Sequence, residues 1–238
     1  MLLYEKPFRL EVLGNRLYKD EKELPFSVRK VSDLKDVLMD PSKMGPDGDA
    51  YFMFRDVFSR PPLRFDITIL VPRLYGDECN KTFGHTHPKS PSGVPYPELY
   101  QVLRGEAFFM LQKRNRDDTY DCLHVEAKEG DIVLIPPNYG HVSVNRSTTS
   151  QLILSNIVSS SFDSVYGEFR ENRGAAFYYT KFGPVQNMHC MVRKSEKAAP
   201  RQILKMYGVV VGDLLETVVE YPEKLEFLGD PSKLPQSP

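Results

Sequence analysis

Two of the five histidines in this 238-residue chain, His85 and His87, lie one residue apart, and Glu98 follows eleven positions later. Alternate residues of a β-strand project to the same face, about 6.5–7 Å apart along the chain. The two imidazoles can therefore chelate one metal, and the Glu98 carboxylate can approach them from the next strand. His141, which follows an apolar run and a Pro-Pro pair, is the candidate fourth ligand. Three imidazoles and one carboxylate leave coordination positions open, which suits catalytic Fe(II), Mn, Ni, Cu or Zn.

A structural role is the alternative for each of these residues. A His-x-His pair is common by chance, and a glutamate at the start of a strand is often only solvated. His124 and His189 carry no such pattern, so we interpret them as ordinary strand residues with satisfied hydrogen bonds.

The elements that position these residues are predicted to be short β-strands. Between Tyr51 and about Met191, apolar and polar residues alternate over short runs with turn residues between them. In the run 63–72, Phe65, Ile67 and Ile69 share one face, whereas Asp66 and Thr68 share the other. Many short strands of this kind are typical of a sandwich or a barrel.

Further patterns predict local elements and the domain organisation. Arg104-Gly105, between two apolar runs, indicates a hairpin. We expect residues 1–50 to form an N-terminal arm with a short helix over 32–40 that packs on the barrel. Residues 51–194 form the barrel, and residues 195–238 form a partly helical C-terminal extension whose last ten residues are expected to fray.

Composition excludes several classes of protein. The net charge is −1, which argues against a surface for nucleic acid or anionic membranes, because both require a basic excess. Three widely spaced cysteines match neither a zinc site nor a disulfide framework, which favours a reducing compartment. No apolar run has the length of a signal peptide or a membrane span. We therefore expect a cytoplasmic protein that binds neither nucleic acid nor membranes.

Both motifs of the cupin superfamily resemble stretches of this chain. The first motif matches His85, His87, Glu98 and Gly105, and the second matches Gly130, Pro136, His141 and Asn145. Asn138 replaces a glycine of the second motif, which is a mild exchange because Asn tolerates left-handed backbone. Cys79 replaces the leading glycine of the first motif, and the loop before Glu98 is longer than usual.

The cupin resemblance implies a fold and a ligand set. The fold would be mainly β, a cupin-type double-stranded β-helix (jelly-roll barrel) with short N- and C-terminal helices and arms. One metal would be bound by His85, His87, Glu98 and His141.

Within the cupins, the chain is most similar to the cupin-type glucose-6-phosphate isomerase family, over about half of its length. The similar stretches are residues 66–72, 81–89, 96–107, 135–145 and 165–179. The resemblance implies a metal-dependent aldose–ketose isomerase that interconverts glucose 6-phosphate and fructose 6-phosphate in glycolysis and gluconeogenesis. It also implies one divalent metal per chain, with Fe(II) preferred over Mn, Ni or Zn, and a homodimer.

The same resemblance assigns roles in substrate binding and catalysis. Its substrate-binding residues correspond to Thr68, Thr82, Gly84, Tyr100 and Tyr166. Glu98 corresponds to the catalytic base, and Asn138 and Ser164 stand where the family has a Tyr and a His. Backbone N–H groups around Gly84 and threonine hydroxyls can hold a phosphate dianion, assisted by Lys81 or Lys89.

The sequence is also compatible with two other functions, and with two mechanisms for the isomerase reaction. The same ligands would suit an Fe(II) cupin oxygenase, and the fold would suit a sugar-binding cupin without catalysis. For the isomerase, the hydrogen can move as a proton through a base and an enediolate, or as a hydride between C1 and C2.

Overall fold

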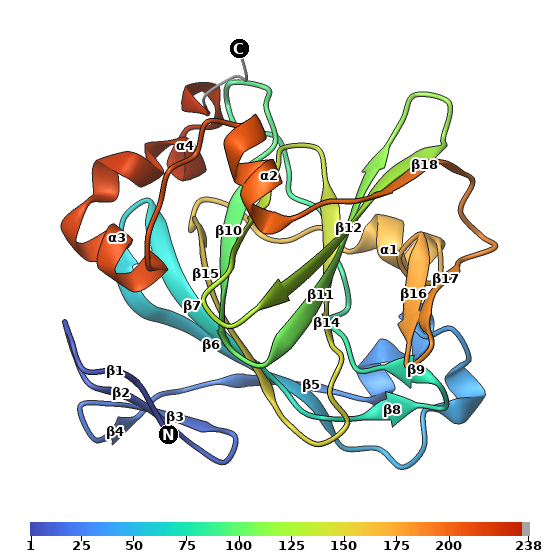
Figure 1. The fold of residues 1–238 in the computed structure, drawn as a ribbon, viewed down its shortest axis with the longest axis horizontal. Helices are drawn as coiled ribbons and strands as arrows, with labels where there is room; N and C mark the ends of the chain where they lie inside the picture. The colour runs from blue at the N-terminus through green and yellow to red at the C-terminus, as the bar shows by residue number, and fades with distance from the viewer. Residues whose placement is uncertain (235–238) are drawn as a thin grey trace.

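The computed structural model describes residues 1–234, and two packed β-sheets form its centre (Figure 1). The larger sheet contains, in spatial order, β13 (Ile132–Ile135), β10 (Glu98–Arg104), β15 (Leu152–Ser159), β7 (Leu63–Leu70), β6 (Asp49–Arg60) and β5 (Ser27–Lys30). The smaller sheet contains β14 (Gly140–Asn145), β11 (Glu106–Arg114), β12 (Tyr120–Lys128) and β18 (Val192–Lys197). The apolar residues of both sheets belong to one core, so the expected mainly β barrel is confirmed.

Strand β7 illustrates how the sequence pattern produces this arrangement. Phe65, Ile67 and Ile69 are fully buried, as the alternation predicts. The intervening Asp66 and Thr68 line a pocket inside the barrel. One strand therefore contributes to the apolar core with one face and to the polar site with the other.

The predicted hairpin at Arg104-Gly105 is wrong. Strands β10 and β11 follow each other in the chain but belong to different sheets, because β10 pairs with β13 and β15 while β11 pairs with β12 and β14. Gly105 has a φ of 89°, a conformation that glycine adopts without strain. The glycine thus marks a corner at which the chain passes from one sheet to the other.

The N-terminal arm is a small antiparallel sheet of four strands (lower left in Figure 1). The strands are β1 (Leu2–Tyr4), β2 (Leu10–Leu13), β3 (Arg16–Lys19) and β4 (Lys22–Glu23). The expected short helix is a 3-10 helix, η1 (Ser32–Val37), which buries Leu34 and Val37, and η2 (Pro41–Lys43) follows it.

Helices near the C-terminus cover the larger sheet from outside. They are α2 (Pro200–Met206), α3 (Leu214–Glu220), η3 (Pro222–Leu225), α4 (Glu226–Gly229) and η4 (Pro231–Lys233). All eight residues of β15 are buried, because α3 and α4 pack against one face of the strand and the other face points into the barrel. We expected residues 229–238 to be frayed, and this prediction is wrong for the residues of η4. Residues 235–238 lie outside the described part of the chain.

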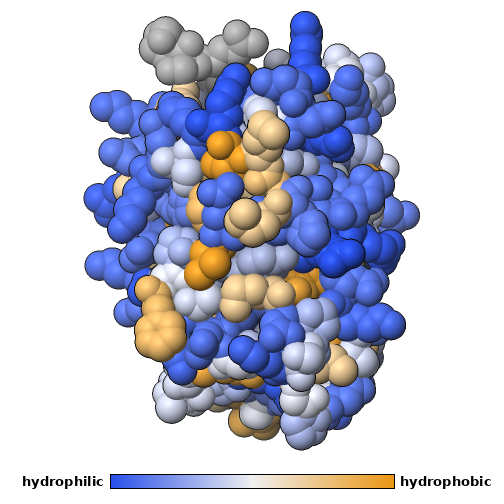
Figure 2. All heavy atoms as spheres, turned by 90° about the vertical axis from the view of Figure 1, so that its right-hand side faces the viewer, coloured by the Kyte–Doolittle hydropathy of each residue, from blue (hydrophilic) through white to orange (hydrophobic). Residues whose placement is uncertain are grey.

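A third group of strands lies beside the smaller sheet, at the right in Figure 1. It contains β8 (Leu74–Tyr75), β9 (Glu78–Cys79), β16 (Phe177–Thr180) and β17 (Gly183–Gln186), with α1 (Gly167–Glu171) preceding β16. Figure 2 shows this side, where apolar side chains are scattered among polar ones; Phe182, Met188 and Met191 are among the exposed apolar residues. Among residues 1–234, no helix is long and apolar enough to cross a membrane.

Candidate functional site

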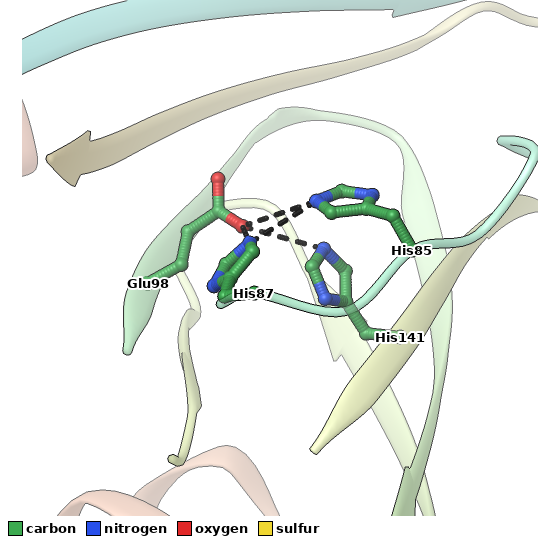
Figure 3. A group of neighbouring side chains, drawn as sticks. All are labelled: His85, His87, Glu98 and His141. Atoms are coloured by element: carbon green, nitrogen blue, oxygen red, sulfur yellow. Dashed lines mark hydrogen bonds and ion pairs between the residues drawn. The ribbon is translucent and has the colours of Figure 1, made fainter. Parts of the chain in front are cut away.

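The four predicted metal ligands converge inside the barrel (Figure 3). Oε2 of Glu98 lies 3.3 Å from Nε2 of His141, 3.4 Å from Nε2 of His87 and 4.0 Å from Nε2 of His85. One ligand atom from each residue lies within 4.8 Å of the corresponding atoms of the other three. The geometry is that of a four-residue group able to enclose one ion.

Backbone pairing brings these residues together. His85 and His141 form an antiparallel bridge, in which His85 N donates to His141 O at 3.2 Å and His141 N donates to His85 O at 3.0 Å. Glu98 is the first residue of β10 and pairs with Ile135 of β13. The site therefore joins both sheets, since His141 belongs to β14 and Glu98 to the larger sheet.

Neighbouring groups orient the ligand side chains. Nδ1 of His87 lies 2.8 Å from the carbonyl oxygen of Tyr96, to which it donates, and so Nε2 keeps its lone pair for the centre of the group. Asn156 Nδ2 donates to Glu98 Oε1 at 2.7 Å, which turns Oε2 toward the histidines. The Tyr100 hydroxyl lies 3.2 Å from Nε2 of His141.

The donor set fits a divalent cation. Glu98 Oε2 is buried and has no hydrogen-bond partner among residues 1–234, although it faces three imidazole nitrogens. Burial lowers the pKa of His141 to about 4 and the pKa of His85 well below its usual value, so these imidazoles are neutral at pH 7. Burial alone would raise the pKa of the Glu98 carboxyl, but the proximity of the His87 and His141 imidazoles lowers it overall. Neutral imidazoles around a carboxylate are the ligands that transition metals require.

All five predicted substrate-binding residues lie around the same cavity as three of the ligands. The cavity is lined by Thr68, Thr82, Gly84, Tyr100 and Tyr166, together with His85, His87 and Glu98. Ser164 lines it too, whereas Asn138 lies on another surface, where its φ of 70° is the left-handed conformation expected from the replaced glycine.

Two of the predictions for phosphate binding need correction. Lys81 is buried away from the cavity, because its Nζ pairs with Glu78 Oε1 at 2.6 Å and donates to the carbonyl of Val37. Lys89 is exposed and does not line the cavity. Gly84 has a φ of 88°, and a Cβ there would lie 2.6 Å from Cγ2 of Val142, so packing alone already requires glycine.

Several polar cavity residues were not predicted from the sequence. They are Arg55, Arg64, Asp66 and Asn156. A signal existed for Arg64 and Asp66, because strand alternation puts both on the face of Thr68. Asn156 had no such signal, since its contact with Glu98 depends on the pairing of β15 with β10.

Comparison with known proteins identifies the family. A family model described as glucose-6-phosphate isomerase (GPI) matches residues 28–198. The glucose-6-phosphate isomerase of Thermococcus litoralis is 27% identical over 150 residues, which cover 60% of this chain and 73% of that protein.

Solved structures align more weakly with this chain. A cupin 2 conserved barrel domain protein from Rhodopseudomonas palustris aligns with 48% of this chain and 63% of its own, at 17% identity and a TM-score of 0.33. An oxalate oxidase aligns with 49% of this chain and 55% of its own, at 16% identity and a TM-score of 0.38. These alignments add nothing to the assignment, whereas the family model covers well over half of the sequence. The chain therefore belongs to the glucose-6-phosphate isomerase family.

Proposed function

We propose that this chain interconverts glucose 6-phosphate and fructose 6-phosphate as a metal-dependent aldose–ketose isomerase. Membership of the family carries the reaction class. The observation that carries the metal dependence is the buried, unpartnered Oε2 of Glu98, which faces the Nε2 atoms of three histidines.

In this proposal, His85, His87, Glu98 and His141 hold one divalent metal ion. The bound ion would act as a Lewis acid for the negative charge that develops on the sugar oxygens near C1 and C2. The remaining catalytic functions fall to the side chains of the cavity.

Glu98 is proposed as the base that moves the proton. In the direction from glucose 6-phosphate, a proton leaves C2 for the carboxylate. The C–H electron pair becomes the C1=C2 bond, and the carbonyl pair moves onto O1. A proton then passes from O2 to O1, the O2–H electron pair becomes the C2=O2 bond, and the C1=C2 pair takes the proton back from the carboxylate at C1, which gives the ketose. The hydrogen bond from Asn156 to Oε1 supports this assignment, because it fixes the carboxylate in one orientation.

Tyr100 is suited to donate a hydrogen bond to a substrate oxygen. Burial, together with the charge of Glu98, raises the pKa of its hydroxyl well above the usual value. The hydroxyl therefore stays protonated at every pH at which the enzyme would work.

The phosphate is proposed to bind at the end of the cavity that contains Thr82, Gly84 and Tyr166. Oγ1 of Thr82 accepts a hydrogen bond from Ser143 N at 3.0 Å, so its own hydrogen is available for an anion. Arg29 supplies positive charge behind this end, since its guanidinium carbon lies 5.8 Å from the ring centroid of Tyr166.

Aromatic side chains support the exclusion of water from the metal side of the cavity. The ring of Phe162 stacks on Tyr96, with centroids 4.7 Å apart, and lies 4.8 Å from the ring of His87. A dry site strengthens the electrostatic interactions between substrate and protein.

Metal analysis combined with an isomerase assay tests the proposal. We expect about one divalent metal ion per chain and hexose-phosphate interconversion without nicotinamide. His141→Ala should lose both, whereas His189→Ala, at an exposed histidine, should keep both. Retained metal and full activity in His141→Ala would contradict the metal site.

Fe(II) as the native metal and the homodimer remain predictions from the family resemblance, and the cytoplasmic location remains a prediction from the cysteine pattern and the charged N-terminal sequence. The same experiment addresses the alternatives. Oxygen uptake without turnover of hexose phosphates would support the Fe(II) oxygenase, and sugar binding without either reaction would support the non-enzymatic cupin.

A further inference from the structure

An arginine with unused donors lies inside the cavity, on β7. The side chain of Arg64 is 16% exposed, and its Nε donates to Asp66 Oδ2 at 2.9 Å. Within residues 1–234 the guanidinium has no other hydrogen-bond or ion-pair partner. Both terminal nitrogens of a fixed, planar donor group are therefore available to a ligand in the cavity.

The pairing of strands places Arg64 at the metal end of the cavity. Residues 64, 66 and 68 alternate on one face of β7, so Arg64 and Thr68 are separated by about 13 Å along the strand. Asp66 pairs with Asn156 of β15, and Asn156 pairs with Tyr100 of β10. Glu98 lies two residues before Tyr100 on β10, and β10 runs antiparallel to β15. Glu98 therefore lies at the same level of the sheet as Arg64, and Thr68 lies toward the opposite end of the cavity.

Asp66 holds the guanidinium in this place. Its side chain is 9% exposed, and its two oxygens accept hydrogen bonds from Asp56 N at 2.9 Å and from Arg64 Nε. A buried carboxylate bonded to the backbone restricts the arginine to few orientations. The cost of ordering a long side chain is therefore met before a ligand binds.

We propose that Arg64, positioned by Asp66, binds the oxygens at the C1–C2 end of the substrate and stabilises the negative charge that develops there. The ligand class is a sugar phosphate with an enediolate-like or carboxylate group opposite the phosphate. This inference rests on the proposed isomerase function. It adds a cationic side chain to the part of the site where charge appears when the proton leaves C2.

A matched pair of ligands tests the inference without turnover. In 5-phosphoarabinonate a carboxylate occupies the place of the reacting carbons, whereas arabinitol 5-phosphate has the same chain with a CH₂OH group instead. Binding of both is measured by calorimetry to protein loaded with Mn²⁺. For Arg64→Met, the dissociation constant of the carboxylate ligand should rise roughly ten- to a hundredfold, and that of the polyol by less than about threefold.

Further variants separate charge from geometry. Arg64→Lys keeps the charge but loses the planar donor group, so an intermediate loss for the carboxylate ligand is expected. Asp66→Asn should give a smaller loss in the same direction, because the arginine remains but is less firmly held. Arg116→Met, at an exposed loop residue, removes the same charge and should change neither constant.

The outcomes distinguish this inference from the function on which it rests. A parent protein that binds neither ligand would contradict the proposed function. If the parent binds both, equal losses for the two ligands in Arg64→Met, or no loss, would overturn the role of Arg64 alone. Loss of Mn²⁺ from Arg64→Met would also overturn it, because the arginine would then support the metal ligands rather than the substrate.

Discussion

Both faces of β10 bury polar side chains, but the hydrogen bonding of these side chains differs between the faces. On the outer face, Gln101 Oε1 accepts from Leu214 N at 2.9 Å, and Nε2 donates to Asp213 Oδ2 at 3.1 Å. Asp213 also accepts a hydrogen bond from the Tyr4 hydroxyl at 3.0 Å. On the inner face, Glu98 is also buried, yet its Oε2 has no hydrogen-bond partner among the described residues.

This difference separates a structural polar cluster from a binding site. The outer cluster is closed, because its members satisfy one another and connect the N-terminal arm and the C-terminal extension to the barrel. The inner group is open, because an unpartnered buried carboxylate oxygen costs free energy until something else binds it. Both Glu98 and Gln101 are buried, so burial does not separate a binding residue from a structural one. The missing hydrogen-bond partner of Glu98 does.

Glu98→Gln should have the largest effect on activity, because it removes the carboxylate from the inner group. The amide is neutral, so we expect metal affinity to fall. It also has no basic form near neutral pH, so excess metal should not restore the rate. A loss on the order of 10²-fold or more in kcat is expected at saturating metal for a missing general base.

Metal titration and steady-state kinetics measure this effect, with Glu126→Gln on the exposed face of β12 as the control. Deuterium in C2 of glucose 6-phosphate formed in deuterated water provides an independent check. Complete absence of deuterium, together with rescue of Glu98→Gln by metal, would exclude Glu98 as the base and favour hydride transfer.

Thr82→Val should have the next largest effect, at the phosphate end of the cavity. The variant keeps the shape but removes a hydroxyl whose hydrogen is available to the phosphate, which should cost roughly 1.5–3 kcal/mol of binding free energy. Inhibition by a sugar phosphate measures the change, and metal content should stay fixed.

Thr86→Val is the matched control for this prediction. Its hydroxyl lies 3.4 Å from the carbonyl oxygen of Val165, and the residue does not line the cavity. Inhibition constants that are the same for parent and Thr82→Val would show that the phosphate binds elsewhere.

The inner group was predictable from sequence because its spacing carries the signal. The His-x-His pair and a strand that begins at Glu98 identify three candidate ligands locally, and the motif spacing added His141. Arg64 was not recognised, because alternation gave its face but not that this face lines the cavity. Asn156 and Gln101 were beyond reach, because their partners lie 58 and 112 residues away and depend on which strands and helices pack together.

The same reason explains the error at Gly105. A glycine between two apolar runs fits a tight hairpin and a corner between sheets equally well. The choice is made by long-range pairing of β10 with β15, which the local sequence does not encode.

Gln101→Leu tests whether the outer face of β10 has a structural role only. The substitution keeps the volume but leaves Leu214 N and one bond of Asp213 unsatisfied, so the free energy of unfolding should fall by about 1–3 kcal/mol. Urea denaturation measures the loss. The kcat of the folded variant should equal that of the parent, and a lowered kcat at unchanged stability would contradict the division between the two faces.

His124 supplies the smallest test, because it is a buried histidine that belongs to a closed cluster. Its Nε2 lies 2.7 Å from Ser195 Oγ, and burial, with a contribution from the charge of Lys197, lowers its pKa from 6.5. As the pH falls below about 6.5, the unfolded chain therefore takes up a proton before the folded protein does, and stability decreases. The stabilising contribution is present above this pH and is lost in acid.

His124→Gln can keep the bond to Ser195 but cannot be protonated, so its stability should fall less than that of the parent between pH 7.5 and 5. The difference is expected to stay below about 1 kcal/mol, because solvent screens part of the charge. Urea denaturation at several pH values measures it, and His189→Gln should reproduce the parent curve. Metal occupancy should be the same in His124→Gln and the parent at pH 7.5. A loss of metal would mean that this histidine is coupled to the inner group, and that a satisfied hydrogen bond does not suffice to separate structural histidines from ligands.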